Sequence, residues 1–230
     1  MDIKVPFRKP AEIEHMVLDL LHKYAKAKGA PPRPPIDVDD IAEKYLKLDL
    51  EVTDLKELLK MPDVLGATWL EDKVVRLDSS LEGKEGRLAF TLAHEIGHWW
   101  MHRPIIEMEK VTLPLYAFEE GRPARPAIVC RSTKKDPAEW QADQFAARLL
   151  MPEADVRATA KQVRGTLPVM IPHLKALKGG SEFGPELRDF ASEVIAAGNF
   201  SNVSNQAMRI RLVDLKLVDD ANDPQGRLLL

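Results

Sequence analysis

Apolar positions near the start of the chain recur at helical spacing. Between Ile13 and Tyr24 they are three or four residues apart, which places them on one face of an α-helix. The pattern predicts an amphipathic helix that ends near Gly29. The run APPRPP (30–35) then interrupts the helical pattern, and Asp37 is placed to cap a short second helix through IAEKYL.

Two later segments partly alternate between apolar and polar residues, as half-buried strands do. The first runs from Leu48 to Thr53. The second runs from about Gly66 to Leu77 and contains EDK, which suits a hairpin turn. The sequence therefore predicts a small sheet.

Helical patterns dominate the next part of the chain. One helix is predicted from Arg87 to His102 and should end at Pro104. Another is predicted from Pro137 to Leu150 and should end at Pro152. A long loop over roughly 104–135 would join the two helices.

Beyond residue 152 the pattern stays mainly helical to about Val218. The chain has 230 residues, of which 45% are hydrophobic, so it can bury a sizeable core. These elements predict an α+β protein in two parts. The first part, 1–155, holds the sheet, and the second, 156–230, is a helical region packed on the same domain.

Charge and cysteine content narrow the classes of function. Lys and Arg number 33 against 36 acidic residues, so no basic field points to direct nucleic-acid binding. No apolar run reaches the roughly 18 residues of a membrane span, and MDIKVPFRKPAEIE lacks the apolar core of a signal peptide. We therefore expect a cytoplasmic protein without a membrane partner. Because Cys130 is the single cysteine, any metal must be bound mainly by histidines and carboxylates.

The stretch LAHEIGHWW (92–100) carries the clearest chemical pattern. His94 and His98 are four residues apart, so on a helix both rings lie on one face, about 6 Å apart, and can reach one ion. Glu95 adjoins that face. This is the HExxH pattern, in which two imidazoles bind zinc and the glutamate accepts a proton from the attacking water. A chance match on a solvated helix face is the alternative interpretation.

The flanking residues favour metal binding. Both histidines fall in an apolar run, where an unpaired polar side chain costs about 1–3 kcal/mol. Gly97 is a poor helix former, about 1 kcal/mol worse than alanine, so another element should pack closely against it. Trp99, Trp100 and Met101 are more typical of a core than of a substrate pocket.

A third ligand must come from another segment. His102 lies about 12 Å along the helix axis from His94, so the two cannot reach one ion. We interpret His102 as a capping or surface residue near the helix end. The metzincin continuation of the motif is excluded, because Met101 and Pro104 stand where its glycine and third histidine belong.

The segment DPAEWQADQFAARLLMP (136–152) offers two acidic residues one helical turn apart. Glu139 can complete the metal site, while Asp143 can accept the outer N–H of a zinc-bound histidine and fix its tautomer. A second interpretation stays open. Asp136 as N-cap, Pro137 in the first turn and Glu139 also form a capping-box-like start, with Asp143 on a solvated face.

These residues resemble the ImmA/IrrE family of zinc metallo-endopeptidases. The resemblance rests on RLAFTLAHEIGHWWMH (87–102), on VCRSTKKDPAEWQADQFAARLLMP (129–152) and more weakly on NFSNVSNQAMRIRLVDLKLV (199–218). It implies a zincin-like catalytic domain over 1–155, in which a small mixed sheet packs on helices that include the HExxH active-site helix. A mainly helical region over 156–230 would follow.

The resemblance also implies site residues and a partner. Carried over to this sequence, the zinc ligands of the family are His94, His98 and Glu139, and its catalytic base is Glu95. Members typically cleave or otherwise inactivate a helix-turn-helix repressor, and so switch on mobile-element or stress-response genes. Some members carry a DNA-binding helix-turn-helix region of their own, and we find no convincing one here.

The expected reaction is water-mediated peptide hydrolysis without an acyl-enzyme. Glu95 would pass the proton to the leaving amine, and an edge strand would hold the peptide extended. The candidates for that strand are Val74–Asp78 and Ala127–Arg131. Candidates for an oxyanion stabiliser are Tyr116, Arg131 and His173.

Other roles remain open at the level of sequence. A regulatory binding protein could keep zinc as a structural element and act by holding its partner. Glu95 beside a complete ligand set favours catalysis, since a structural zinc site needs no general base. A zinc hydrolase of small substrates is less favoured, because no cofactor or phosphate loop is visible. Cys130 could reach the metal as an inhibitory ligand, but a small buried residue is the preferred interpretation.

Overall fold

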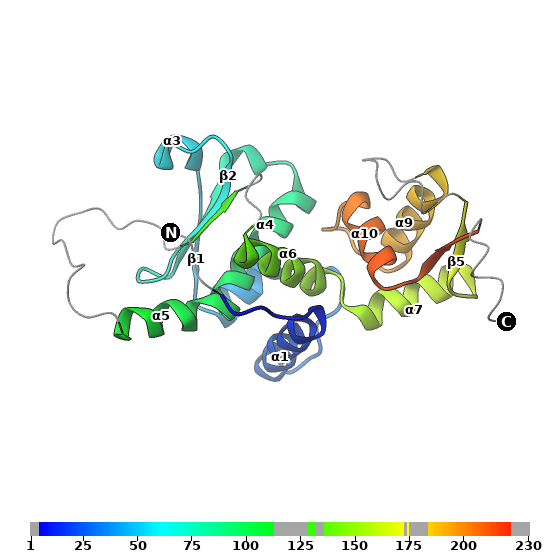
Figure 1. Cartoon of the computed structure of the whole chain (residues 1–230), viewed down its shortest axis with the longest axis horizontal. Helices are drawn as coiled ribbons and strands as arrows, with labels where there is room; N and C mark the ends of the chain where they lie inside the picture. Colours follow the sequence, from blue (N-terminus) through cyan, green and yellow to red (C-terminus); the bar gives the residue numbers. More distant parts are fainter. Residues whose placement is uncertain (1–4, 113–127, 132–135, 173, 175–183, 222–230) are drawn as a thin grey trace.

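The structure is a computed structural model, and it describes residues 5–112, 128–131, 136–172, 174 and 184–221. Figure 1 shows a sheet at one end of the molecule, helices across its middle and a second group of helices at the other end. Within these ranges, no helix is both long enough and apolar enough to cross a membrane.

The first helix, α1 (Pro10–Lys28), has the amphipathic character that the sequence predicts. Its start is stabilised by the Glu12 carboxylate, which accepts a hydrogen bond from the Lys9 N–H at 2.6 Å. Gly29 ends the helix in a left-handed conformation with a φ of 76°, as expected. The buried face of α1 consists of Ile13, Val17, Leu20, Leu21 and Tyr24.

A short helix, α2 (Val38–Asp40), continues directly into a π-helical turn, η1 (Ile41–Tyr45). The Asp37 carboxylate accepts a hydrogen bond from the Asp40 N–H at 2.9 Å. The predicted N-cap and the predicted second helix are therefore confirmed.

Four strands form one mixed sheet in the order β1-β3-β2-β4. Strand β1 (Asp49–Thr53) is parallel to β3 (Val74–Asp78), whereas β2 (Val64–Trp69) is antiparallel to both β3 and β4 (Ile128–Arg131). A short helix, α3 (Leu55–Leu59), connects β1 to β2. The predicted first strand and the predicted hairpin, formed by β2 and β3, are confirmed.

The strand order corrects two predictions. Val74–Asp78 is not an edge strand, because β3 lies between β1 and β2 and its side chains are buried on both faces, as is typical of a central strand. Strand β4 lies within the segment that was predicted to be a loop. Among the strands that the structure describes, β4 pairs only with β2, so this part of the candidate Ala127–Arg131 does lie at a sheet edge.

The helix that carries the HExxH residues extends further than predicted. Helix α4 (Glu85–Gly97) passes into a π-helical turn, η3 (His98–His102), and then into α5 (Arg103–Thr112). The prediction that Pro104 ends this helix is wrong. The first N–H of α5 bonds to the first carbonyl of η3, five residues back. Such a turn widens the helix and accommodates a proline that would clash with the preceding turn of a regular α-helix.

Helix α6 (Pro137–Leu150) has the predicted bounds and packs along α4. The two helices approach closely at Gly97, where an added Cβ would lie 3.1 Å from the Cβ of Phe145. The expectation that another element packs against Gly97 is therefore confirmed. A 3₁₀ turn, η2 (Ser79–Leu81), leads from the sheet toward α4.

The chain after α6 is mainly helical, as predicted. The structure describes α7 (Glu153–Arg164), α9 (Pro185–Ala197) and α10 (Asn205–Asp214) in this part. Two short strands, β5 (Val169–Ile171) and β6 (Val218–Asp220), pair in parallel, which the sequence pattern did not predict. The segment QGRLLL lies outside the described residues, and the division of the chain at residue 155 stays a prediction.

One cluster of buried apolar side chains extends through both ends of the molecule, from Ile13 in α1 to Val218 in β6. Trp99 and Met101 are buried in this cluster, and Trp100 packs against it. Their interpretation as core residues is therefore confirmed.

Candidate metal centre

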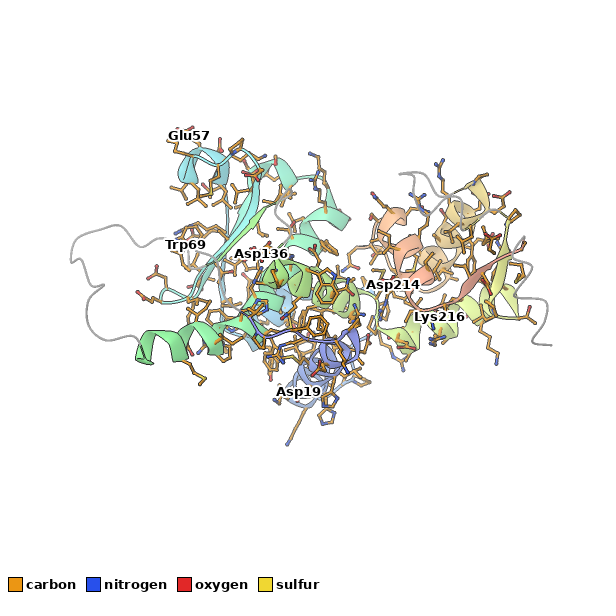
Figure 2. The ribbon with its side chains drawn as sticks, viewed as in Figure 1. Asp19, Glu57, Trp69, Asp136, Asp214 and Lys216 are labelled. Carbon is orange, nitrogen blue, oxygen red and sulfur yellow. The ribbon has the colours of Figure 1, made fainter. Side chains whose placement is uncertain are left out.

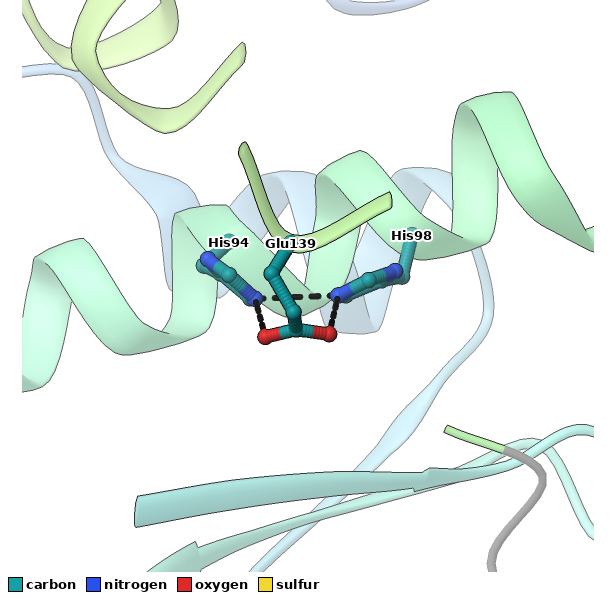
Figure 3. A group of neighbouring side chains, drawn as sticks. All are labelled: His94, His98 and Glu139. Carbon is teal, nitrogen blue, oxygen red and sulfur yellow. Dashed lines mark hydrogen bonds and ion pairs between the residues drawn. The ribbon is translucent and has the colours of Figure 1, made fainter. Parts of the chain in front are cut away.

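Two helices bring three candidate ligands together. His94 lies in the last turn of α4, His98 begins η3, and Glu139 lies in the first turn of α6. The Nε2 atoms of the two histidines are 2.9 Å apart, and they lie 3.2 and 3.1 Å from the two carboxylate oxygens of Glu139. Figure 3 shows the carboxylate facing both rings. All three side chains are buried, and the cluster could hold a metal ion.

The start of α6 has features of both interpretations of Glu139, and the role of Glu139 as a ligand stays a prediction. The Asp136 carboxylate caps α6 by accepting a hydrogen bond from the Glu139 N–H at 3.0 Å. The cap uses only the backbone of Glu139, and its side chain turns toward the histidines. Figure 2 shows Asp136 near the middle of the molecule, away from Asp214 and Lys216 in the C-terminal part.

Asp143 lies one turn further along α6, where its Oδ1 atom is 2.9 Å from His94 Nδ1. The side chain is 56% exposed, so water can solvate the other carboxylate oxygen. An ionised carboxylate only accepts hydrogen bonds, so His94 must carry its proton on Nδ1. The lone pair of His94 Nε2 then points to Glu139 and His98.

The chemistry of this donor set fits a metal cation. A lone pair of His94 and a carboxylate face each other inside the protein, and among the described residues the buried Oε2 atom of Glu139 has no hydrogen-bond partner. Acceptors that converge without a proton repel one another, whereas a cation would satisfy them. Two imidazoles and one carboxylate are a common donor set for a transition metal.

The ionisable groups of the cluster have shifted pKa values. Burial raises the pKa of Glu139, but the neighbouring His94 and His98 lower it more, to about 2. Burial lowers the pKa of His98. The cluster therefore pairs an ionised carboxylate with the imidazole of His98, whose uncharged form is favoured by burial.

Glu95 lies on the face of α4 that packs against the sheet, beside β2. Its Oε2 atom accepts a hydrogen bond from Thr68 Oγ1 at 2.5 Å, and in the part of the chain that the structure describes its buried Oε1 atom has no hydrogen-bond partner. Burial raises the pKa of Glu95 to about 7. Gly66 leaves room for the side chain, because a Cβ there would lie 2.8 Å from Glu95 Oε1. One face of β2 thus supports Glu95.

The roles of Gly66 and Thr68 were not predicted from the sequence. Strand residues two positions apart point to the same face of a sheet, so both face α4. The two-residue alternation of side chains was visible in the predicted strand. The sequence did not indicate which helix would cover this face of the strand.

The interpretation of His102 as a capping or surface residue is wrong. The side chain is fully buried, and its Nδ1 atom lies 2.9 Å from His98 Nδ1. Its Nε2 atom lies 3.1 Å from Gln141 Oε1 on α6. Burial, together with the nearby His98, lowers the pKa of His102 to about 3. The spacing of four residues from His98 would have indicated this contact.

The remaining candidates stay untested by the structure. Tyr116 and His173 lie outside the described residues. Arg131 and Cys130 belong to β4, for which the structure describes the backbone and not the side chains.

The fold and the cluster define a mixed α+β protein with a buried candidate metal centre on two packed helices. Residues 45–176 match the family Peptidase_M78, the IrrE N-terminal-like domain. The match covers more than half of the chain, including α4 and α6, so the protein belongs to this peptidase family. No curated protein matches the sequence.

Proposed function

We propose that the protein is a zinc-dependent endopeptidase with a zincin-like catalytic domain. The observation that carries this proposal is the convergence of His94, His98 and Glu139 from two helices, in a chain of a peptidase family. Three protein ligands of this kind leave a coordination position open, as catalytic zinc sites do. Zinc, when bound there, would supply Lewis-acid polarisation of the attacking water and of the scissile carbonyl.

Glu95 is the proposed general base. Thr68 holds one carboxylate oxygen, while the other, Oε1, has no hydrogen-bond partner within the described residues. Oε1 is therefore the atom that accepts the proton of the attacking water and then delivers it to the leaving amine. The hydrogen bond from Thr68 restricts the rotation of the carboxylate and keeps Oε1 in place.

The substrate is proposed to bind as an extended strand beside β4. Helix α4 packs against β4, so a peptide along this edge of the sheet would pass near the HExxH residues. Backbone hydrogen bonds to an edge strand hold a peptide extended whatever its side chains.

A helix-turn-helix repressor is the proposed protein substrate. The resemblance of segments 87–102 and 129–152 to ImmA/IrrE proteins is the sole support for this partner. Cleavage of such a repressor would switch on gene expression, including stress-response genes, and would take place in the cytoplasm.

The main test combines metal analysis with a single substitution at Glu95. We expect about one zinc per chain, and cleavage of a repressor encoded beside this gene. The variant Glu95→Gln should keep zinc and fold but lose about 10²–10⁴-fold in cleavage rate, because the amide cannot accept the proton. The matched control, Glu82→Gln, changes an exposed glutamate and should cleave like the native protein.

The outcome also separates the two classes of function. If Glu95→Gln relieves repression in cells as well as the native protein does, hydrolysis is not the mechanism. The protein would then act as a regulatory binding protein with a structural zinc site.

A further inference from the structure

A line of buried polar contacts leads from His98 to the N-terminal segment. His98 Nδ1 lies 2.9 Å from His102 Nδ1, and His102 Nε2 lies 3.1 Å from Gln141 Oε1. The Gln141 amide nitrogen donates to the Pro6 carbonyl oxygen at 2.8 Å. The histidines and Gln141 are at most 1% exposed, so water does not compete for the contacts among them, whereas the outer contact with the exposed Pro6 is only part-buried.

The last of these contacts fixes the direction of all the others. A backbone carbonyl only accepts hydrogen bonds, so Gln141 must present its NH₂ group to Pro6 and its oxygen to His102. His102 must then donate from Nε2, which leaves the lone pair on its Nδ1. His98 must in turn donate from Nδ1, and its Nε2 lone pair faces Glu139.

The reverse direction would leave two acceptors in contact. If His102 donated from Nδ1 to His98, its Nε2 would need a donor from Gln141. The amide oxygen of Gln141 would then face the Pro6 carbonyl oxygen at hydrogen-bond distance. Two acceptor oxygens at this distance repel each other, and the oxygen of the buried Gln141 would lose its donor.

We propose that His102, Gln141 and the Pro6 carbonyl form a positioning chain that keeps His98 in its metal-binding tautomer. This inference rests on the proposed metal site, but not on peptide hydrolysis. It gives His102 a positioning role and makes the segment before α1 part of the metal site. Pro6 lies outside residues 45–176, so this support comes from beyond the family match.

The two histidines are thus oriented by different means. His94 is held by Asp143, a half-exposed carboxylate on the surface of the site. His98 is held by neutral groups in the interior, where a charge would be costly to bury. A series of hydrogen bonds between buried neutral side chains keeps one arrangement of protons without a nearby charged side chain, provided that each side chain has its hydrogen-bond partner.

The first test reads the proton positions in the native, zinc-loaded protein by nitrogen NMR of its histidines. The positioning chain predicts that His102 carries its proton on Nε2 and that His98 carries its proton on Nδ1. A scalar coupling between the two facing Nδ1 atoms should be observed across their hydrogen bond. A proton on His102 Nδ1, alone or together with one on Nε2, would overturn the proposal.

The second test measures the zinc dissociation constant by chelator competition. Gln141→Leu keeps the size of the side chain but removes both hydrogen bonds, and it should weaken zinc binding by about 10–100-fold, as loss of such partners typically does. Leu149→Ala is the matched control, because Leu149 is buried on the same helix and is not a member of the chain. It should lower thermal stability without changing zinc affinity. Equal affinity of folded Gln141→Leu and native protein would overturn the proposal.

The results also distinguish this inference from the proposed function. If the native protein binds zinc but cleaves no repressor, the peptidase proposal fails and the positioning chain is unaffected. If the native protein binds no zinc, the proposed metal site fails. The tautomer of His102, measured in the zinc-free protein, then still decides whether the chain of hydrogen bonds exists in the predicted direction.

Discussion

Two buried acidic sites in this protein differ in how their oxygens are satisfied. Asp78 ends β3, and its Oδ2 atom accepts hydrogen bonds from the N–H groups of Leu55 and Lys56 at 3.1 and 3.3 Å. Its Oδ1 atom accepts from the N–H and hydroxyl of Ser80 and pairs with the Lys56 ammonium at 2.9 Å. Every acceptor position of Asp78 that faces the protein is thus used, and the residue joins β3, α3 and η2.

Glu95 shows the opposite arrangement. It is buried as deeply as Asp78, but from the residues that the structure describes it accepts one hydrogen bond, from Thr68, and its second oxygen has no partner among them. Burial raises the pKa of Glu95 to about 7, whereas donors around Asp78 outweigh the raising effect of burial and lower its pKa to about 2. A carboxylate surrounded by donors supports the fold, while one with a free oxygen is available for chemistry.

The largest expected effect is the loss of zinc on substitution of Glu139, the other buried acid of the candidate metal centre. Glu139→Ala should strip zinc, because it removes one of three protein ligands. Asp136→Ala is the control, since it removes only the cap of α6 and should cost about 1 kcal/mol of stability with zinc retained. Metal analysis and thermal unfolding of both variants check this. Full zinc occupancy in Glu139→Ala would make Glu139 a structural residue.

The next effect should appear at the satisfied site. Asp78→Ala leaves the N–H groups at the start of α3 without their acceptor and should lower the free energy of unfolding by about 1–3 kcal/mol. Zinc content and cleavage rate per folded molecule should stay at native values. Denaturant unfolding measures the free energy and metal analysis measures the zinc content. A loss of zinc in this variant would contradict the assignment of a purely structural role to Asp78.

The pH dependence of stability offers a finer test at Asp78. Its pKa is about 2 in the folded protein, below its ordinary value of 3.8, so the folded state favours the ionised form. The stabilisation is therefore fully present above about pH 4 and lost as pH falls toward 2. Asp78→Asn should lose less stability than the native protein over this acidic range. Parallel acid-unfolding curves for the two proteins would contradict the assigned pKa shift.

The smallest effect is expected from Thr68, which contacts Glu95 but touches no candidate ligand. Thr68→Val removes the hydroxyl that holds Glu95 Oε2 and should slow cleavage roughly tenfold, in line with the loss of one hydrogen bond to a charged group. Zinc affinity should not change. Thr68→Ser, which keeps the hydroxyl, should retain most of the activity, and equal rates for the valine and serine variants would show that the hydroxyl does not act through Glu95.

Most elements that support the site followed from local sequence patterns. The spacing of His94 and His98, the position of Glu139 on a second helix and the hairpin of β2 and β3 each depend on periodicity within a few residues. These short-range features predicted that His94 and His98 share a helix face, whereas the approach of Glu139 was one of two interpretations and was implied by the family resemblance. The close approach at Gly97 was also predicted, because a glycine within a helix is unfavourable unless packing requires it.

Features that depend on long-range packing could not be predicted in this way. The apparent stop at Pro104 was overridden by the π turn η3, which no local preference indicated. His102 belongs to the same turn, and the contacts that bury His102 come from α6 and the segment near Pro6. Thr68 and Gly66 could be placed on a strand face, but their contact with Glu95 required the packing of the sheet against α4.

The most direct test of the central claim is anomalous X-ray diffraction at the zinc edge from crystals of the native protein. We expect one anomalous peak, about 2.0–2.2 Å from His94 Nε2, His98 Nε2 and a carboxylate oxygen of Glu139. A peak at another place, or none between these three side chains in zinc-soaked crystals, would contradict the proposal that they hold the catalytic metal.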